Sequence, residues 1–147
     1  MKANTEEETR YINVAKIPGD FEKAIEDLEL RLKIAKEVGN RAGEKRSFPN
    51  LGNAYHSVGG FRKAIKYHKL DLKIAKEVGD RAGEGSSYAN LGNAYQSLGD
   101  FKKAIDYHEL DLKIAKEVGD RAEEGRSYGN LGNVYHSLGD FKSHRVP

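Results

Sequence analysis

Apolar residues recur at spacings of three and four along the middle of the chain, and this spacing predicts two amphipathic helices. In the first helix, predicted for 81–98, Tyr88, Leu91, Tyr95 and Leu98 lie on one face. The second helix, predicted for 101–118, carries two apolar rows, so that one row can face its partner helix and the other the next unit. The two rows are Phe101, Ala104, His108, Leu112, Ala115 and Ile105, Leu110, Ile114, Val118.

The ends of both helices are marked by residues with strong capping preferences. Asp80 and Asp100 can accept hydrogen bonds from the free amides of a first helical turn. Gly99 and Gly119 can adopt the left-handed conformation that commonly ends a helix. The sequence therefore predicts a unit made of helix, two-residue turn and helix.

A glycine lies in the interior of the first helix. Gly92 is costly there, because glycine destabilises a helix by roughly 1 kcal/mol relative to alanine. Such a residue is expected where another helix approaches closely. We predict that Gly92 contacts the small side chain of Ala104 on the partner helix.

The two-helix pattern repeats every forty residues without a gap. A fixed period of this size is typical of stacked units whose apolar faces are buried by their neighbours. We therefore predict one domain over 1–147. Its parts are a degenerate capping unit (1–40), two complete repeats (41–80 and 81–120) and a truncated repeat (121–147).

Both incomplete units are expected to begin or end irregularly. In the first, 1–17 should form a short capping helix, and Pro18, Gly19 and Asp20 should form a turn before a helix over 21–38. In the last, a helix over 121–138 should be followed by a turn and the first residues of a second helix. The rest of that helix is missing, so its apolar stripe should be uncovered and should favour self-association. The stripe includes Tyr128, Leu131, Tyr135 and Leu138.

The first complete repeat contains an unfavourable residue. Pro49 stands where the other copies have Ala89 and Gly129. Because proline inside a helix costs about 3 kcal/mol, we predict either a kink near Phe48 or a new helix that starts at Pro49. Gly60 replaces the capping aspartate, so this junction should be the least rigid of the complete units.

The pattern Tyr88, Leu91, Gly92, Tyr95, Gly99, Phe101 and Ala104 resembles the tetratricopeptide repeat family. This resemblance implies an all-α protein, an α-solenoid in which about seven helices form antiparallel pairs and a right-handed superhelix. Standard members have a period of about 34 residues, and the longer forty-residue units worded LGNAY and SLGDF look like the Pins/LGN-type branch. Members of that branch are adaptors of cell polarity and spindle orientation. The resemblance also implies a concave groove for protein or peptide ligands.

Polar residues at matched positions of the first helices are the candidates for this groove. Asparagine is a poor helix former, and its side-chain amide offers both donors and an acceptor, so matched asparagines can bind the main chain of an extended peptide. Recent duplication that simply copied the asparagines is the alternative explanation. The predicted peptide-binding residues are Arg46, Asn50, Asn53, His56, Asn90, Asn93, Gln96, Arg126, Asn130, Asn133 and His136. Members of the family that bind the C-terminal carboxylate of a peptide use lysine or arginine beside such asparagines. In this sequence the expected lysine positions hold Pro49, Ala89 and Gly129, so we do not expect binding of this kind.

The sequence predicts no catalytic site, metal site or nucleic-acid-binding surface. The chain has no cysteine, and His68 and His108 share a repeat slot that Leu28 fills in the first unit, so they should be packed side chains. Charged residues make up 33% of the chain and the net charge is +2, with both signs interleaved on the same helices. Residues such as Asp71, Asp111 and Glu117 therefore indicate a solvated, ion-paired surface. We expect no enzyme activity, cofactor, nucleic acid or membrane contact, and a cytoplasmic location.

Two functions of different class remain. The first is an adaptor module that binds extended peptides in the groove. The second is a structural or self-assembling repeat protein that forms homodimers through its uncovered C-terminal end.

Overall fold

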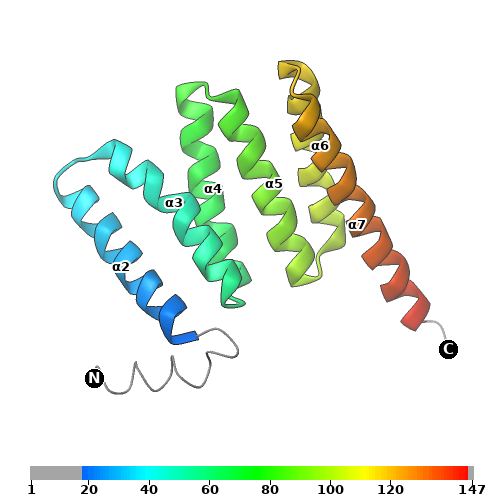
Figure 1. The fold of residues 1–147 in the computed structure, drawn as a ribbon, viewed down its shortest axis with the longest axis horizontal. Helices are drawn as coiled ribbons and strands as arrows, with labels where there is room; N and C mark the ends of the chain where they lie inside the picture. Colours follow the sequence, from blue (N-terminus) through cyan, green and yellow to red (C-terminus); the bar gives the residue numbers. More distant parts are fainter. Residues whose placement is uncertain (1–17, 146–147) are drawn as a thin grey trace. The chain divides into compact units, whose positions relative to one another are not determined.

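The computed structural model describes residues 18–145, which form six α-helices joined by tight turns and contain no β-strand (Figure 1). The predicted all-α solenoid of helix pairs is therefore confirmed for this part of the chain. The capping helix predicted for 1–17 lies outside the described residues. The helices are α2 (Pro18–Glu37), α3 (Arg41–Ser57), α4 (Phe61–Val78), α5 (Arg81–Leu98), α6 (Phe101–Val118) and α7 (Arg121–Arg145).

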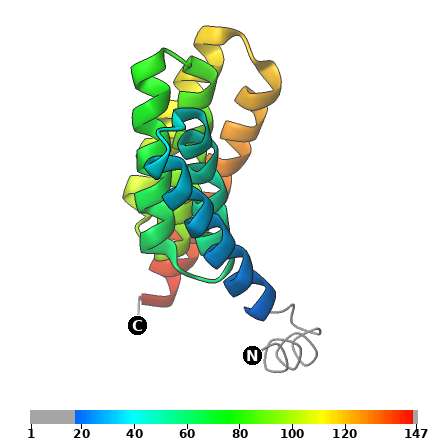
Figure 2. The ribbon, with the colours of Figure 1, turned by 90° about the vertical axis from the view of Figure 1, so that its left-hand side faces the viewer.

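The helices belong to two compact units, one ending at Tyr67 and the other beginning at His68, so that α4 contributes to both. In the first unit, α2 packs along α3, as Figure 2 shows from the α2 side. The Tyr55 hydroxyl of α3 donates a hydrogen bond to Glu29 of α2. In the second unit, α6 packs against both α5 and α7. Candidate functional residues of the second unit are positioned by this three-helix arrangement.

The predicted caps and turns are confirmed at both ends of α5 and of α6. Asp80 Oδ1 accepts a hydrogen bond from the Gly83 amide at 2.9 Å, and Asp100 Oδ1 accepts one from the Lys103 amide at 3.2 Å. Gly99 has a φ of 92°, and Gly119 at the end of α6 has a φ of 76°. These positive angles favour glycine, so the glycine after each helix fixes the turn.

Two local predictions and one alternative of a third are wrong, because a helix is present where a break was expected. The helix α2 already begins at Pro18, a first-turn position where proline is tolerated. The helix α3 continues through Pro49, so the alternative of a new helix that starts there is wrong, and the kink near Phe48 stays a prediction. Its neighbours Phe48 and Leu51 are buried, and burial of such side chains stabilises by about 1.5–3 kcal/mol each, enough to offset the proline.

The helix α7 also continues through Gly139 to Arg145, although a turn was predicted at this point. Gly139 lacks the positive φ that the turn glycines share. A turn would have removed local backbone hydrogen bonds without a packed second helix in return, since residues 143–147 depart from the apolar pattern. The chain therefore keeps its helical hydrogen bonds.

The core of the second unit follows the predicted apolar stripe. Tyr88, Leu91 and Tyr95 of α5 are buried. Both tyrosines lie against Tyr107 of α6, and the Tyr95 and Tyr107 rings stack in nearly parallel planes with centroids 5.5 Å apart. Phe48 and Tyr55 lie against Tyr67 in the same way in the first unit. One tyrosine of the second helix thus contacts two aromatic rings of the first.

The close contact of Gly92 is made with a different residue from the one predicted. A Cβ atom on Gly92 would lie 2.5 Å from His108 Nε2, and the next nearest atoms belong to the same ring. The buried imidazole of His108, and not Ala104, therefore requires a glycine at this position. The prediction that His68 and His108 are packed side chains is confirmed by their burial.

Candidate functional site

In the second unit, the helices α5 and α7 lie side by side and both pack on α6. Gln96 of α5 donates a hydrogen bond from Nε2 to the Ser137 hydroxyl of α7, with 3.3 Å between the two atoms. Both residues were predicted to lie on the polar face of the first helices, and their hydrogen bond shows that α5 and α7 present a common surface in the second unit.

Four predicted asparagines lie on this surface, and two more lie at the matched positions of α3 in the first unit. Asn50, Asn53, Asn93 and Asn133 are exposed, and Asn90 and Asn130 are partly exposed. Within the described part of the chain, none of the six side-chain amides has a hydrogen-bond partner. Asn40, in contrast, caps α3 by accepting a hydrogen bond from the Gly43 amide at 2.9 Å. We use the term asparagine face for Asn90, Asn93, Asn130 and Asn133 of the second unit.

The charged and aromatic members of the predicted site are partly engaged within the chain. Arg126 donates to Glu123 Oε1 on the preceding turn at 2.8 Å. His136 lies 3.5 Å from Asp140, and the His56 ring packs on Phe61 with centroids 5.1 Å apart. Arg46 lines a cavity of about 330 Å³ in the first unit.

The predicted association stripe is divided by the structure. Tyr128 and Tyr135 are 52% and 53% exposed, whereas their counterparts Tyr88 and Tyr95 on α5 are almost fully buried. Leu131 is buried, and Leu138 is partly exposed. The expectation that Leu131 is uncovered is therefore wrong, because α7 packs on α6 and this contact covers the leucine without a further helix.

A cavity of about 140 Å³ lies beneath the surface shared by α5 and α7, and sequence reasoning missed it. We call it the Asp111 pocket. Asp111 has no exposed surface, and its Oδ2 accepts a hydrogen bond from the Ser127 hydroxyl at 2.9 Å. The expectation of a solvated Asp111 is wrong, because this side chain points between the helices and not outward. The lining residues are Ala82, Gly85, Ser86, Asp111, Ile114, Ala115, Val118, Asp120, Glu123 and Arg126.

The electrostatics of the Asp111 pocket are unusual. Burial, with Glu123 as a second carboxylate within hydrogen-bonding reach, raises the pKa of Asp111 to about 7. The Ser127 hydroxyl and the Arg126 guanidinium act in the opposite direction. Asp111 can therefore change its protonation state near neutral pH, which few carboxyl groups do.

A signal for this pocket was present in the sequence. The repeat slot of Asp111 lies between two leucines in every unit that contains it and holds the exposed Arg31 in the first, so a charged side chain recurs between two apolar neighbours. Glu123 stands where the other copies have Gly43 and Gly83. The recognisable feature is therefore Glu123, a carboxylate in a slot that holds glycine in the other repeats.

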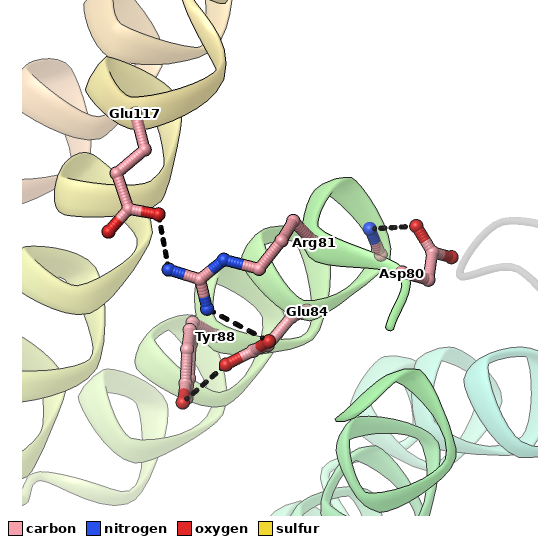
Figure 3. A network of polar contacts seen from close by, with 6 residues as sticks. Asp80, Arg81, Glu84, Tyr88 and Glu117 are labelled. Carbon is pink, nitrogen blue, oxygen red and sulfur yellow. Dashed lines mark hydrogen bonds and ion pairs between the residues drawn. The ribbon is translucent and has the colours of Figure 1, made fainter. Parts of the chain in front are cut away.

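An ionic network holds the N-terminal end of α5 against α6 beside this pocket (Figure 3). Arg81 forms an ion pair with Glu117 of α6 and another with Glu84 one turn along, at 3.0 Å. The Tyr88 hydroxyl donates to Glu84 Oε2 at 3.2 Å. These contacts position Gly85 and Ser86 over the pocket.

None of the helices in 18–145 combines the length and apolar character that a bilayer crossing requires. The same part of the chain contains no group of three histidine, aspartate or glutamate side chains arranged to hold a metal ion.

Comparison with known proteins gives a family and a set of related structures. The model of the tetratricopeptide repeat family matches residues 50–117 and 84–143. A crystal structure of BtubC (BKLC) from P. vanneervenii is 31% identical with a TM-score of 0.75, covering 84% of this chain and 52% of that one. The TPR domain of Arabidopsis FLU is 27% identical with a TM-score of 0.62, covering 67% and 83%. The chain thus spans about half the length of the BtubC chain. No curated protein matches it.

Proposed function

Because the chain belongs to the tetratricopeptide repeat family, we propose that it is an adaptor module that binds extended peptide segments through the asparagine face. Repeat proteins of this kind use the surface formed by successive units to bind protein partners. The forty-residue period and the LGNAY and SLGDF words further favour the Pins/LGN-type branch.

The observation that carries this proposal is the unpaired state of the asparagine amides. Asn90 and Asn93 on α5 and Asn130 and Asn133 on α7 flank one surface and have no partner in the described residues. Each amide can donate and accept, so it can bind a peptide N–H or C=O group without regard to the peptide's side chains. Asparagine disfavours helices, and these four residues cap no helix end, so a ligand accounts for them better than local structure does.

Replacement of these four asparagines by alanine is expected to weaken peptide binding at least about tenfold. A hydrogen bond contributes about 0.5–1.5 kcal/mol, and 1.4 kcal/mol corresponds to a factor of ten. Peptides would be selected on the wild-type chain from a random twelve-residue display library, and their Kd measured by fluorescence anisotropy.

A matched control is available on the outer face of α6. Lys102, Asp106, Glu109 and Lys113 are exposed, and their joint replacement by alanine leaves the net charge unchanged. Binding by this control should stay within about twofold of wild type. Equal losses in the two quadruple variants, or no loss in either, would remove the asparagine face from the account.

A second candidate function is self-association through α7, which is supported by the exposed tyrosines Tyr128 and Tyr135. On α5 the matched tyrosines contact Tyr107 of the following helix, and no described segment occupies that position on α7. Burial of a large apolar side chain contributes about 1.5–3 kcal/mol, against an association cost of about 4–15 kcal/mol. A two-fold contact would bury both tyrosines of both chains and close without forming a filament.

We expect wild-type chains to dimerise reversibly, and the Tyr128→Ser, Tyr135→Ser double variant to remain monomeric. Light scattering over a dilution series would measure this. The control is the Tyr128→Phe, Tyr135→Phe pair, which keeps both rings and should still dimerise. A monomeric wild type at all concentrations would end this second proposal.

A further inference from the structure

We propose that the Asp111 pocket binds a primary ammonium group, such as that of a lysine side chain, between the carboxyl groups of Asp111 and Glu123. That the ammonium group belongs to a lysine of the peptide ligand rests on the proposed function. That the pocket binds an ammonium group rests on the geometry of the second unit alone.

The first support is an acceptor atom without a donor. Asp111 Oδ2 is bound by Ser127, but the buried Oδ1 has no hydrogen-bond partner in the described part of the chain. An unsatisfied buried acceptor costs about 1–3 kcal/mol. The nearby Glu123 carboxylate is also an acceptor when ionised, so a donor shared by the two groups is missing once both carboxyl groups are ionised. A bound ammonium would supply N–H donors to both.

The second support is the absence of an α5 side chain over this atom. A Cβ atom on Gly85 would lie 3.0 Å from Asp111 Oδ1 and 3.3 Å from Ile114 Cγ2, so the α5 backbone approaches the carboxyl group closely. The glycine keeps a side chain off this carboxyl group, and any other residue would press against it. The matched Gly125 of α7 faces open space, with no atom within 4 Å of its hypothetical Cβ, so the close approach is made by one glycine and not by the repeat in general.

The chemistry of the pocket favours ammonium over other cations. A guanidinium binds best to a carboxylate with two free oxygens, but Glu123 Oε1 is already bound by Arg126 at 2.8 Å. An ammonium is a compact charge with three donors, which suits a cavity of about 140 Å³. Ile114, Ala115 and Val118 supply an apolar wall for the methylene groups that precede it.

Binding of the cation should be coupled to release of a proton. The charged groups around Asp111 are Glu123 and Arg126 on α7 and Asp120 in the preceding turn, while α5 contributes the uncharged Ala82, Gly85 and Ser86. Near neutral pH, Asp111 is partly protonated and can donate that proton to Glu123. An ammonium that takes the same position displaces the proton into solvent. Affinity should therefore rise as the pH increases from 6 to 8.

The probe for this site is n-butylammonium, the side chain of lysine without its backbone, titrated at constant ionic strength set with sodium chloride. The neutral control ligand is N-butylacetamide. Backbone amide shifts in ¹H–¹⁵N spectra at Gly85, Asp111 and Glu123 should move with n-butylammonium and saturate, and should not move with the control. The Kd should be several-fold lower at pH 8 than at pH 6.

Variants separate a specific site from general charge attraction. Asp111→Asn keeps the shape and the Ser127 hydrogen bond and should raise the Kd at least tenfold, whereas Glu109→Gln removes an exposed charge from the same helix and should not. Gly85→Ala should also weaken binding, and Gly125→Ala should leave it unchanged.

Saturable shifts that survive Asp111→Asn and Gly85→Ala, or equal shifts with the neutral ligand, would overturn the proposal. This outcome does not depend on the asparagine face. If n-butylammonium binds but the asparagine variants still bind selected peptides as wild type does, the pocket stands and the proposed function fails. If the reverse is found, the proposed function stands without the pocket.

Discussion

Gly92→Ala is expected to destabilise the protein, although the same substitution in an isolated helix is stabilising. Alanine favours a helix over glycine by about 1 kcal/mol. At this position, however, the new methyl group would lie 2.5 Å from the buried His108 ring. Overpacking a core costs about 1–3 kcal/mol, and a contact this short belongs at the upper end. We therefore expect a net loss of roughly 2 kcal/mol in the free energy of unfolding, measured by urea titration followed by circular dichroism.

The matched control for this substitution is Gly132→Ala on α7. Gly132 occupies the same repeat position, but its hypothetical Cβ meets no atom within 4 Å. Here the helical preference of alanine acts alone and should raise the stability by up to about 1 kcal/mol. The two variants should thus differ in sign. If both stabilised the protein, the contact between Gly92 and His108 would not be the reason for the glycine.

The stability of the protein is expected to decrease between pH 5 and pH 8 because of Asp111. Its pKa is raised from 3.8 in a solvated state to about 7 in the fold, so the folded chain binds the proton more tightly than the unfolded chain. Such a group contributes stability below its unfolded pKa and loses it as the pH rises through the folded value. One pKa unit corresponds to about 1.4 kcal/mol, and the loss should be on the order of 2 kcal/mol.

Asp111→Asn should remove most of this pH dependence. Asparagine resembles the protonated aspartic acid, since it can accept from Ser127 and donate to Glu123. The variant should be at least as stable as wild type at pH 8, and the two should converge toward pH 5. Thermal unfolding at matched ionic strength would measure both, with Glu109→Gln as the charge control. An unchanged slope in the Asp111 variant would show that another group carries the pH dependence.

Much of the fold could be predicted because it is specified by residues that act locally. Asp80, Asp100, Gly99 and Gly119 set the ends of α5 and α6 by backbone capping, which depends on few distant contacts. The spacing of apolar positions then predicted the buried stripe of α5 and most of one row of α6, whereas Leu110 and Val118 of the other row are 39% and 49% exposed.

The errors concern features that depend on tertiary contacts. Gly139 has the sequence of a turn glycine, but whether a helix stops there depends on what the next segment can pack against. The partner of Gly92 could not be identified from spacing, because Ala104 and His108 lie one turn apart on the same face of α6. Asp111 was misplaced for a related reason: a charged residue between two leucines is expected outside unless the opposing Ser127 and Glu123 are known.

The candidate site was predicted in part. The four asparagines of the second unit are exposed or partly exposed on α5 and α7, and peptide binding by them stays a prediction. The burial of Leu131 could not be recognised from the sequence. The burial of Leu131 depends on the neighbouring helix α6, whereas Arg126 and Glu123 lie three residues apart on α7, a spacing that favours their ion pair. The polar positions of α5 and α7 were predictable, and the hydrogen bond between Gln96 and Ser137 across the two helices was not.

The measurement that tests peptide binding most directly is the response of the asparagine side chains themselves. With a display-selected peptide added to ¹⁵N-labelled protein, the side-chain NH₂ signals of Asn90, Asn93, Asn130 and Asn133 should shift and be protected from exchange with water. Signals from the exposed face of α6 should stay unchanged. Shifts confined to α6, with the four asparagine amides unaffected at saturation, would contradict the account.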